Sequence, residues 1–314
     1  MTFLEMLNAH YDEMLRLRES LGYAVGKNPE QVREFILFCG TGFPDSTGIT
    51  KEMLDLWLEN KTFKTNSTHN YAITKIRGFT RYLLSIEVPA FVPPSDYSVK
   101  VVRYNPYIFT DVELTRLFAA IDSHPPHHVS PNREHIVPVI FRMMYCCGMR
   151  PSEPPSLLME DVNFRTGEIY IRQSKGFQDR RVLMSADLTE LCSQYASRMM
   201  PQRYLFEVKV GERISSEWIT HQFGYCWRNS GLQKRGNPRP YDLRHNFVTR
   251  TFMRWIDEGK DVNALAPYLS SYLGHKELTA TLYYLRLLPE HLLNSAGIDW
   301  SRFSRIYKGV LNEK

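Results

Sequence analysis

The chain of 314 residues has little cysteine, and its five cysteines include no C-x-x-C pair. Few, scattered thiols in a chain of this length are typical of a reducing, cytosol-like compartment. The first residues lack the basic and apolar segments of a signal peptide. No apolar run approaches the roughly 20 residues of a membrane-spanning helix. We therefore expect a cytoplasmic protein without disulfides, with reduced thiols in its core at Cys39, Cys146, Cys147, Cys192 and Cys226.

Motifs for nucleotide and metal binding are also missing. No Walker or dinucleotide-binding glycine motif occurs, so the sequence implies no nucleotide cofactor. Four histidines gather around Pro125 and Pro126, but no cysteine or carboxylate completes a known zinc-ligand spacing. We therefore predict no metal site at these histidines, which are His124, His127, His128 and His135.

The charge of the chain is mildly basic. Its formal net charge is +5 and its sequence pI is about 8.8. Acidic and basic residues nearly balance before about residue 105, so the excess of positive charge lies in the C-terminal two thirds. A charge of this sign fits a polyanionic partner but does not establish one.

Residues 1–90 are predicted to form a small helical domain. Apolar residues recur at helical spacing in four segments, over approximately residues 2–21, 29–38, 50–59 and 66–85. Thr50 is the candidate N-cap of the third segment, and either Asn66 or Ser67 is the candidate N-cap of the fourth.

A linker is expected to follow this domain. Residues 91–106 contain Pro93 and Pro94 and have no helical periodicity, which favours an extended connection. Basic side chains in the fourth helix and in the linker have two interpretations, a solvated basic surface or a set of contacts to phosphate groups. These side chains are Lys75, Arg77, Arg81, Lys100 and Arg103.

Residues 107–314 are predicted to form a second, larger domain. Alternating apolar residues favour a β-hairpin with arms at 168–172 and 180–184 and with Lys175 near its tip. A tail of short helices is expected over about 289–309. Helical patterns occur over approximately residues 110–121, 135–147, 186–199, 216–228, 242–257, 262–273 and 277–286. The predicted fold class is therefore mainly α with a small antiparallel β-sheet.

Three short motifs in this second region carry the strongest functional signal. They are Gly148-Met149-Arg150-Pro151-Ser152-Glu153, Tyr241-Asp242-Leu243-Arg244-His245, and Leu273-Gly274-His275 followed nine residues later by Tyr284. These motifs resemble the active-site boxes of the tyrosine recombinases, the phage integrase family, in the family's order and at about its spacing. The resemblance covers about residues 108–286. It implies a helical N-terminal core-binding domain and an integrase-type catalytic domain.

By this resemblance, Tyr284 is a nucleophile that attacks a DNA phosphate and forms a 3′-phosphotyrosine. A free phenol has a pKa near 10, so the nucleophile needs activation by nearby cations or by a base. Tyr283 is a competitor, but neighbours in a helix differ by about 100° in direction, so only one of the two can face the site. The family's interval of nine residues after His275 selects Tyr284.

Arg150 and Arg244 suit a phosphate clamp, because a guanidinium group is always charged and its planar fork of donors matches phosphate oxygens. Both lie beside apolar segments, and a buried arginine must be paired or must serve an anion. Glu153 resembles the family's acidic residue that supports the active site. Lys175 resembles the family's lysine that protonates the departing 5′-oxygen, and Arg181 in the same hairpin is a candidate DNA contact.

Two histidines supply the remaining groups in the resemblance. His275 corresponds to the residue that bonds the scissile phosphate, and His245 lies near the nucleophile as the candidate general base. One position departs from the family, because the first residue of its H-x-x-R box is commonly histidine and here is Tyr241. A phenol can donate a hydrogen bond to phosphate but cannot carry positive charge. We expect a tolerated change that can lower the rate or move the pH dependence away from a histidine's pKa.

The resemblance implies double-stranded DNA as the partner and no cofactor, because a phosphotyrosine preserves the energy of the phosphodiester. It also implies a DNA-associated homotetramer on two sites, with accessory recombinases as further candidate partners. The C-terminal tail would dock on a neighbouring copy or pack on its own domain. We expect a site-specific recombinase that acts as integrase, transposase or resolvase. The alternatives are a non-catalytic DNA-binding or architectural protein and a DNA-relaxing enzyme similar to type IB topoisomerases.

Overall fold

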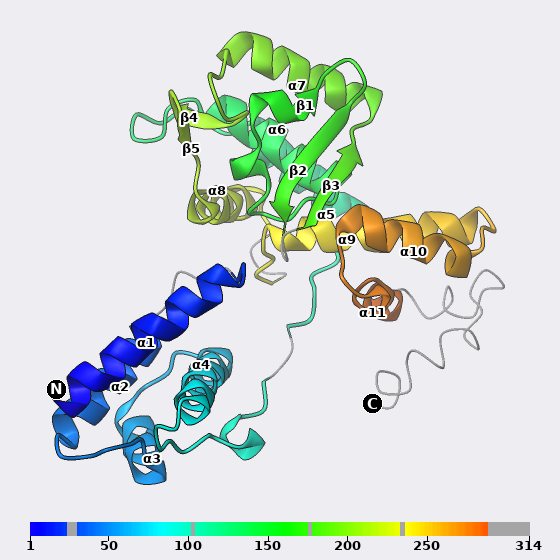
Figure 1. Ribbon diagram of the computed structural model, residues 1–314. Helices are drawn as coiled ribbons and strands as arrows, with labels where there is room; N and C mark the ends of the chain where they lie inside the picture. The colour runs from blue at the N-terminus through cyan, green and yellow to red at the C-terminus, as the bar shows by residue number, and fades with distance from the viewer. Residues whose placement is uncertain (24–29, 102–103, 175–177, 233–235, 288–314) are drawn as a thin grey trace. The chain divides into compact units, whose positions relative to one another are not determined.

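The computed structural model describes all residues except 24–29, 102–103, 175–177, 233–235 and 288–314 (Figure 1). The chain divides into two compact units, Met1–Tyr104 and Asn105–Lys314. Its helices and its small antiparallel sheets confirm the predicted fold class. Among the described residues, no helix combines the length and the apolar character needed to span a lipid bilayer.

The described part of the N-terminal unit contains four α-helices, α1 (Phe3–Ser20), α2 (Glu30–Gly42), α3 (Lys51–Asn60) and α4 (Asn66–Ser85). Their apolar faces meet in one core, whose buried side chains include Leu7, Phe35, Trp57 and Phe79. The predicted cap of α4 is wrong: Thr65, not Asn66 or Ser67, has the extended backbone of an N-cap, and its hydroxyl accepts a hydrogen bond from the Thr68 amide.

Residues 91–100, the first part of the expected linker, are tied to the helices of the N-terminal unit. The side-chain amide of Asn70 forms two hydrogen bonds with the main chain of Val99. It donates to the Val99 carbonyl at 2.8 Å and accepts from the Val99 amide at 2.9 Å. Other side chains of α4 also donate to carbonyl groups of this segment, from Asn66 to Lys100 and from Arg77 to Pro93 and Pro94. The segment is therefore held against α4 by long-range side-chain bonds.

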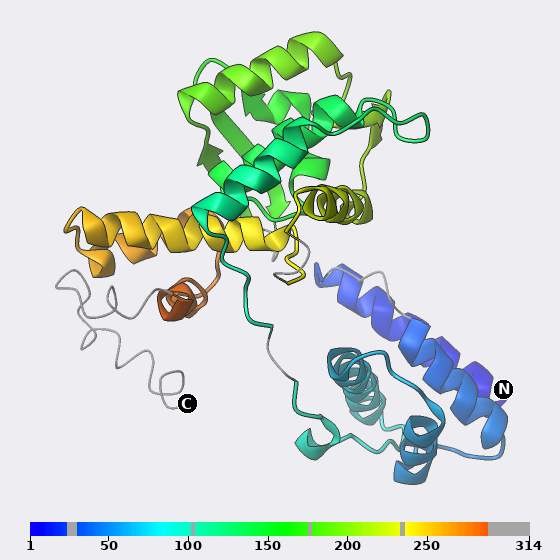
Figure 2. The same cartoon turned by 180° about the vertical axis from the view of Figure 1, so that it is seen from behind.

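The C-terminal unit is organised around α6 (Arg133–Cys146). This helix packs against α5 (Asp111–Asp122), α7 (Ala186–Met199) and α9 (Tyr241–Asp257) (Figure 2). An antiparallel sheet has the order β1 (Val162–Asn163), β2 (Glu168–Ser174) and β3 (Gln178–Leu183), which confirms the predicted hairpin. The unit also contains the paired strands β4 (Glu207–Lys209) and β5 (Glu212–Arg213), and α8 (Ser216–Asn229), which packs on α5.

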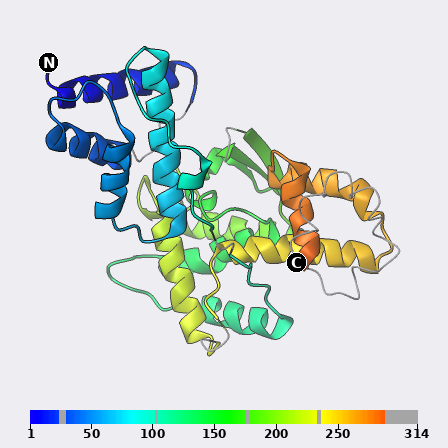
Figure 3. The same cartoon turned by 90° about the horizontal axis from the view of Figure 1, so that it is seen from below.

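The last described elements form a second apolar cluster with α9. They are α10 (Val262–Leu273), α11 (Leu278–Leu282) and the 3₁₀ helix η5 (Tyr283–Leu287), which Figure 3 shows together at one end of the unit. The prediction of a single helix over 277–286 is therefore wrong, because the chain tightens from α to 3₁₀ winding after Leu282, as helix ends often do. This winding places Tyr284 and Leu285 in the core. Because α10 packs on β3, the turn that follows α10 lies next to the sheet.

The prediction of five core thiols is wrong at one position. Cys146, the last residue of α6, is exposed, whereas the other four cysteines are buried. Successive side chains of a helix differ by about 100° in direction, so Cys146 at the end of α6 can be exposed beside buried Cys147. Burial raises the pKa of Cys39 to about 12. The buried thiols are therefore protonated and unreactive at neutral pH.

Gly148 is required by packing as well as by backbone conformation. Its φ is +61°, and a Cβ there would lie 2.5 Å from Cδ1 of Phe247 on α9. Gly148→Ala is expected to lower the free energy of unfolding by about 2–4 kcal/mol, through left-handed strain plus overpacking. Gly211→Ala is the matched control, because Gly211 has φ +75° but open space around it, and should cost only about 1 kcal/mol. Urea unfolding measures both losses, and equal losses would contradict the packing explanation.

Candidate active site

Arg150 lies in the loop between α6 and the 3₁₀ helix η2 (Pro154–Ser156). Its side chain is buried and donates from Nη1 to Oε1 of Glu153 at 2.9 Å and from Nη2 to the Gly274 carbonyl at 2.9 Å. The Arg150 amide also donates to Oε2 of Glu153, at 2.7 Å. The first sequence motif is therefore bonded to the third across a separation of 124 residues.

Glu153 is buried and accepts hydrogen bonds from a second arginine, Arg180 on β3. Nη1 and Nη2 of Arg180 reach the two carboxylate oxygens at 2.7 Å each. Burial alone would raise the pKa of Glu153, but the hydrogen bonds and charge of Arg180, with the Arg150 amide, lower it below its ordinary value. The carboxylate is therefore ionised between two guanidinium groups. Arg180 was not a predicted site residue. The alternation of side chains along a strand shows that Arg180 and Arg181 face opposite sides of the sheet, but it does not show which of them faces the site.

Arg244 on α9 is completely buried. Its Nη1 donates to the Gly148 carbonyl at 2.8 Å, and its Nη2 donates to the Leu273 carbonyl at 2.7 Å. Within the described residues, its Nε has no hydrogen-bond partner. Burial lowers the pKa of Arg244, but a guanidinium group stays protonated in proteins. Arg244 therefore brings a positive charge to the point where all three motifs meet.

His275 follows the turn at Gly274, and its Nε2 lies 3.1 Å from Nη2 of Arg244. Arginine can only donate, so Nε2 of His275 is an acceptor and the ring proton is assigned to Nδ1. Nδ1 lies 2.7 Å from the Thr281 hydroxyl, which can accept that proton. Burial, with the charges of Arg244, Arg150 and Arg180, lowers the pKa of His275 to about 3. The imidazole is therefore neutral at physiological pH.

Tyr284 is 3% exposed, and its hydroxyl oxygen lies 3.0 Å from Nδ1 of His245. Burial, followed by the neighbouring Tyr241, raises the pKa of Tyr284, while the charge of Arg244 opposes the shift. Burial, with the charges of Arg239 and Arg244, lowers the pKa of His245 to about 4. The phenol and the imidazole are therefore both neutral at physiological pH and are placed for proton transfer between them.

Two residues without a role in the sequence interpretation support these histidines. Thr281 is buried and bonds His275 as described. Asp242 is fully buried, and its Oδ1 lies 3.8 Å from Nε2 of His245. A carboxylate at that side favours the tautomer with its proton on Nε2, which leaves Nδ1 to accept from Tyr284. Asp242 lies inside the second motif and Thr281 six residues after His275, but neither position alone shows which ring nitrogen it faces.

A cavity of about 600 Å³ opens over these groups. Tyr241 contributes to its wall, and the ring of Tyr241 lies 4.8 Å from that of His245, centroid to centroid. The structure thus brings together most of the predicted catalytic residues, namely Arg150, Glu153, Tyr241, Arg244, His245, His275 and Tyr284. Lys276 and Glu277 also line the cavity and were not predicted.

The remaining predicted residues are outside the described ranges, in the N-terminal unit or on β3. Lys175 and Arg103 fall outside the described residues. In the N-terminal unit, the Lys75 ammonium is 5.1 Å from the centre of the Tyr71 ring, Arg77 bonds two carbonyls of the 91–100 segment, and Arg81 and Lys100 are exposed. Arg181 on β3 is exposed, 3.6 Å from Glu168. Within the described ranges, no three His, Cys, Asp or Glu side chains form a metal-binding group.

The site can perform transesterification at a phosphate. A phenol sits beside a neutral base, Arg150 and His275 line the same cavity, and the buried Arg244 lies directly behind His275. Positive groups fixed in a site of low dielectric stabilise the charge that develops on a phosphoryl group without reorganisation. The arrangement is therefore suited to transesterification at a phosphate.

The profile of the phage integrase family matches residues 108–291, more than half of the chain. A putative integrase/recombinase of Sinorhizobium fredii, y4rB, is 27% identical over 290 residues, which cover 88% of this chain and 92% of that protein. The tyrosine recombinase XerA of Thermococcus kodakarensis is 29% identical over 229 residues, 72% of this chain and 73% of that one. The XerH site-specific recombinase, solved with a palindromic difH substrate after cleavage, shares the fold with a TM-score of 0.61 at 18% identity, over 87% and 78% of the two chains.

The two neutral histidines predict that the folded chain loses stability as the pH falls. Unfolded histidine takes up a proton near pH 6.5, whereas folded His245 and His275 resist protonation down to about pH 4 and about pH 3. The unfolded state therefore binds more protons in this window, and stability decreases from about pH 6.5 downward. His275→Asn should reduce the loss between about pH 7 and about pH 5 by about 1 kcal/mol, after allowance for solvent screening. Urea unfolding at both pH values measures this difference. The same loss of stability in His275→Asn as in wild type would contradict the assignment of a neutral His275 in the folded chain.

Proposed function

The chain belongs to the phage integrase family and is a site-specific tyrosine recombinase, an enzyme that cleaves and rejoins DNA strands; we propose that Tyr284 is its nucleophile. The observation that carries this proposal is the contact between the Tyr284 hydroxyl and Nδ1 of His245, in a cavity that Arg150 also lines. Tyr283 lines the same cavity but is less buried and makes an edge contact with the Tyr284 ring. A packing role suits Tyr283 better.

In the proposed reaction, the Tyr284 oxygen forms a bond to phosphorus while the bond between phosphorus and the 5′-oxygen of the DNA breaks. The phenolic proton passes to Nδ1 of His245, and Lys175 gives a proton to the departing 5′-oxygen. The 3′-phosphotyrosine has the same number of phosphoester bonds as the substrate, so no cofactor is consumed. The 5′-hydroxyl of a partner strand then attacks the phosphotyrosine, and both proton transfers run in reverse.

We propose that Arg150, Arg244 and His275 bind the non-bridging oxygens of the scissile phosphate. In the unbound protein, the two arginines donate to main-chain carbonyl groups. A phosphate bears more negative charge than a carbonyl and forms stronger, charge-assisted bonds, so it competes for these donors. His275 presents a lone pair from Nε2 in the unbound protein, and negative charge on the bound phosphate raises its pKa and so favours a proton there.

Double-stranded DNA is the partner of this site. We propose that phosphate contacts dominate the affinity, which would then fall steeply with salt. The candidate contacts are Lys75, Arg77, Arg81, Lys100, Arg103 and Arg181, of which Arg77 contributes least because two of its donors already bond carbonyls. We further propose a homotetramer on two DNA sites, with the C-terminal tail docked on a neighbouring copy and with accessory recombinases as candidate partners.

Neither alternative activity is favoured. A non-catalytic DNA-binding protein has no need of a tyrosine, a base and two arginines gathered at one site. A DNA-relaxing enzyme would use the same chemistry, but the similar proteins of Sinorhizobium fredii and Thermococcus kodakarensis are named as recombinases. Integrase, transposase and resolvase roles all use the proposed chemistry.

Covalent trapping tests the nucleophile. A nicked substrate would carry the target site, identified first by binding selection from DNA that flanks the coding sequence. Cleavage next to the nick loses the short 5′-hydroxyl fragment, so the phosphotyrosine cannot reverse and accumulates. Wild type and Tyr283→Phe should give a protein–DNA band on a denaturing gel, and Tyr284→Phe should give none. A band lost in Tyr283→Phe and kept in Tyr284→Phe would contradict the assignment.

The phenol of Tyr241 is expected to donate a hydrogen bond to the phosphate in place of the family's common histidine. Tyr241→Phe keeps the ring contact with His245 but removes this donor. A hydrogen bond to a charged group contributes about 1.5–3 kcal/mol, so the single-turnover cleavage rate should fall roughly 10- to 100-fold. Tyr283→Phe, on the same cavity wall, is the control and should fall little. Equal rates for Tyr241→Phe and wild type would show that the phenol does not contact the phosphate.

A further inference from the structure

Building on the proposed function, we propose that Arg180 is a positioning residue that fixes Arg150 and the Gly274–His275 turn relative to each other. Arg180 lies outside the three sequence motifs and does not line the cavity over Tyr284. It reaches both phosphate-binding groups through intermediates, one a carboxylate and the other a main-chain turn. Its role would be to set the distance between two oxygen-binding groups that come from different parts of the chain.

The first connection runs through Glu153. Both terminal nitrogens of Arg180 donate to this carboxylate at 2.7 Å, one to each oxygen. The same two oxygens accept from the Arg150 side chain at 2.9 Å and from the Arg150 amide at 2.7 Å. Four donors therefore converge on one buried carboxylate, and a movement of Arg180 passes directly to Arg150.

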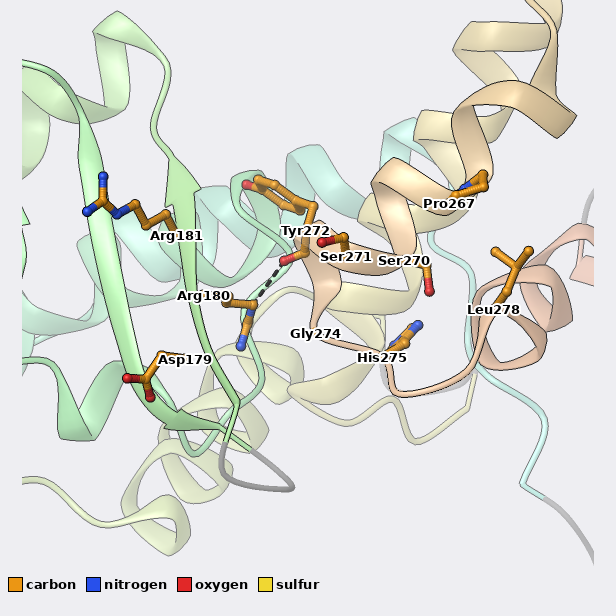
Figure 4. A pocket seen from close by; sticks show the side chains of 10 residues that line it. All are labelled: Asp179, Arg180, Arg181, Pro267, Ser270, Ser271, Tyr272, Gly274, His275 and Leu278. Atoms are coloured by element: carbon orange, nitrogen blue, oxygen red, sulfur yellow. Dashed lines mark hydrogen bonds between the residues drawn. The ribbon is translucent and has the colours of Figure 1, made fainter.

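The second connection runs to the end of α10. Nε of Arg180 donates to the Tyr272 carbonyl at 3.0 Å, the bond drawn in Figure 4. The side-chain stem packs below Gly274, where a Cβ would lie 3.0 Å from Cδ of Arg180. Gly274 has φ +66° and leads directly into His275. The Arg180 side chain, which comes from the sheet, thus supports the turn that leads into His275.

The two faces of β3 differ in a way that supports this role. Arg180 points toward the Gly274–His275 turn, whereas Arg181 points away on the other face of the strand (Figure 4). Arg180 is buried, and the side chain of Arg181 is 71% exposed with a single long contact to Glu168. A buried guanidinium is costly unless its donors are used. Here three donors serve two elements that both border the catalytic cavity.

Lysine would not replace Arg180. A guanidinium fork donates to both oxygens of one carboxylate in a fixed plane and still has Nε for a third acceptor, whereas an ammonium is a point charge on a flexible stem. A role in charge balance alone would tolerate lysine, because both side chains carry one positive charge. The comparison of alanine and lysine therefore separates positioning from charge.

The test compares Arg180→Ala, Arg180→Lys and the control Arg142→Ala. Arg142 also forks onto a carboxylate, that of Asp122, but on the outer surface of α6. Single-turnover cleavage of the nicked substrate and the Kd for the same DNA are measured for each variant. Displacement of catalytic groups by about 1 Å costs roughly 100-fold in rate. Arg180→Ala should therefore cleave roughly 100-fold more slowly than wild type, and Arg180→Lys at least about tenfold more slowly. The Kd of each variant for the DNA should stay within about threefold of wild type. Millimolar guanidinium should partly restore cleavage by Arg180→Ala.

A second readout does not depend on cleavage. The charged and titratable groups near the His275 ring include Arg244, Arg150, Arg180 and His245, the stacked ring of Tyr284, and Lys276 and Glu277 on the same cavity wall. NMR titration of the His275 imidazole should show proton uptake at higher pH in Arg180→Ala than in wild type, and no change in Arg142→Ala. If wild type forms no covalent complex but the His275 titration also changes in Arg180→Lys, which keeps the positive charge, the proposed function fails while the positioning role stands. Wild-type cleavage by both Arg180 variants, with an unchanged His275 titration, would overturn the inference.

Discussion

The rest of the site depends on the ion pairs that the buried carboxylate of Glu153 forms with two arginines. This carboxylate is the negative charge between Arg150 and Arg180, and Arg244 also acts on it electrostatically. Removing one partner of a buried ion pair leaves an uncompensated charge and costs about 3–5 kcal/mol. Without Glu153, three guanidinium groups would repel one another at the point where α6, β3 and α9 converge. One negative charge among three positive ones also leaves the site attractive to a phosphate.

The site is held together by the same donors that the proposed reaction needs. Main-chain carbonyls of Gly148, Leu273 and Gly274 accept from the two clamp arginines, and Nε2 of His275 accepts from Arg244. These acceptors carry only partial charges, so they hold the arginines in place without matching a phosphate in strength. The buried phenol of Tyr284 is protonated at neutral pH, and in the proposed reaction it gives its proton to His245 as its oxygen bonds phosphorus. In the proposed reaction, these fixed positive groups would act most strongly when charge develops on phosphorus.

The sequence predicted the parts of this site that local motifs encode, including the arginines and histidines of the boxes and the tyrosine at a fixed interval after His275. It did not predict Arg180, because the partner carboxylate is 27 residues away and strand alternation gives no partner. The attachment of residues 91–100 was missed for a similar reason, since Asn70 pairs with Val99 over 29 residues. Helix periodicity also failed at Tyr283, where the chain changes to 3₁₀ winding so that Tyr284 enters the core. Local chemistry was visible in the sequence, and long-range side-chain bonds were not.

The central claim is that one phenol among several aromatic rings in this cavity becomes bonded to DNA. Mass spectrometry of the trapped complex tests it most directly, after nuclease digestion leaves a nucleotide on the attacking residue. Trypsin releases Glu277–Arg286, which contains both candidate tyrosines, and fragmentation of this peptide locates the adduct. The account predicts a nucleotide on Tyr284 alone. An adduct on Tyr283, or on Tyr241 in a different peptide, would contradict it.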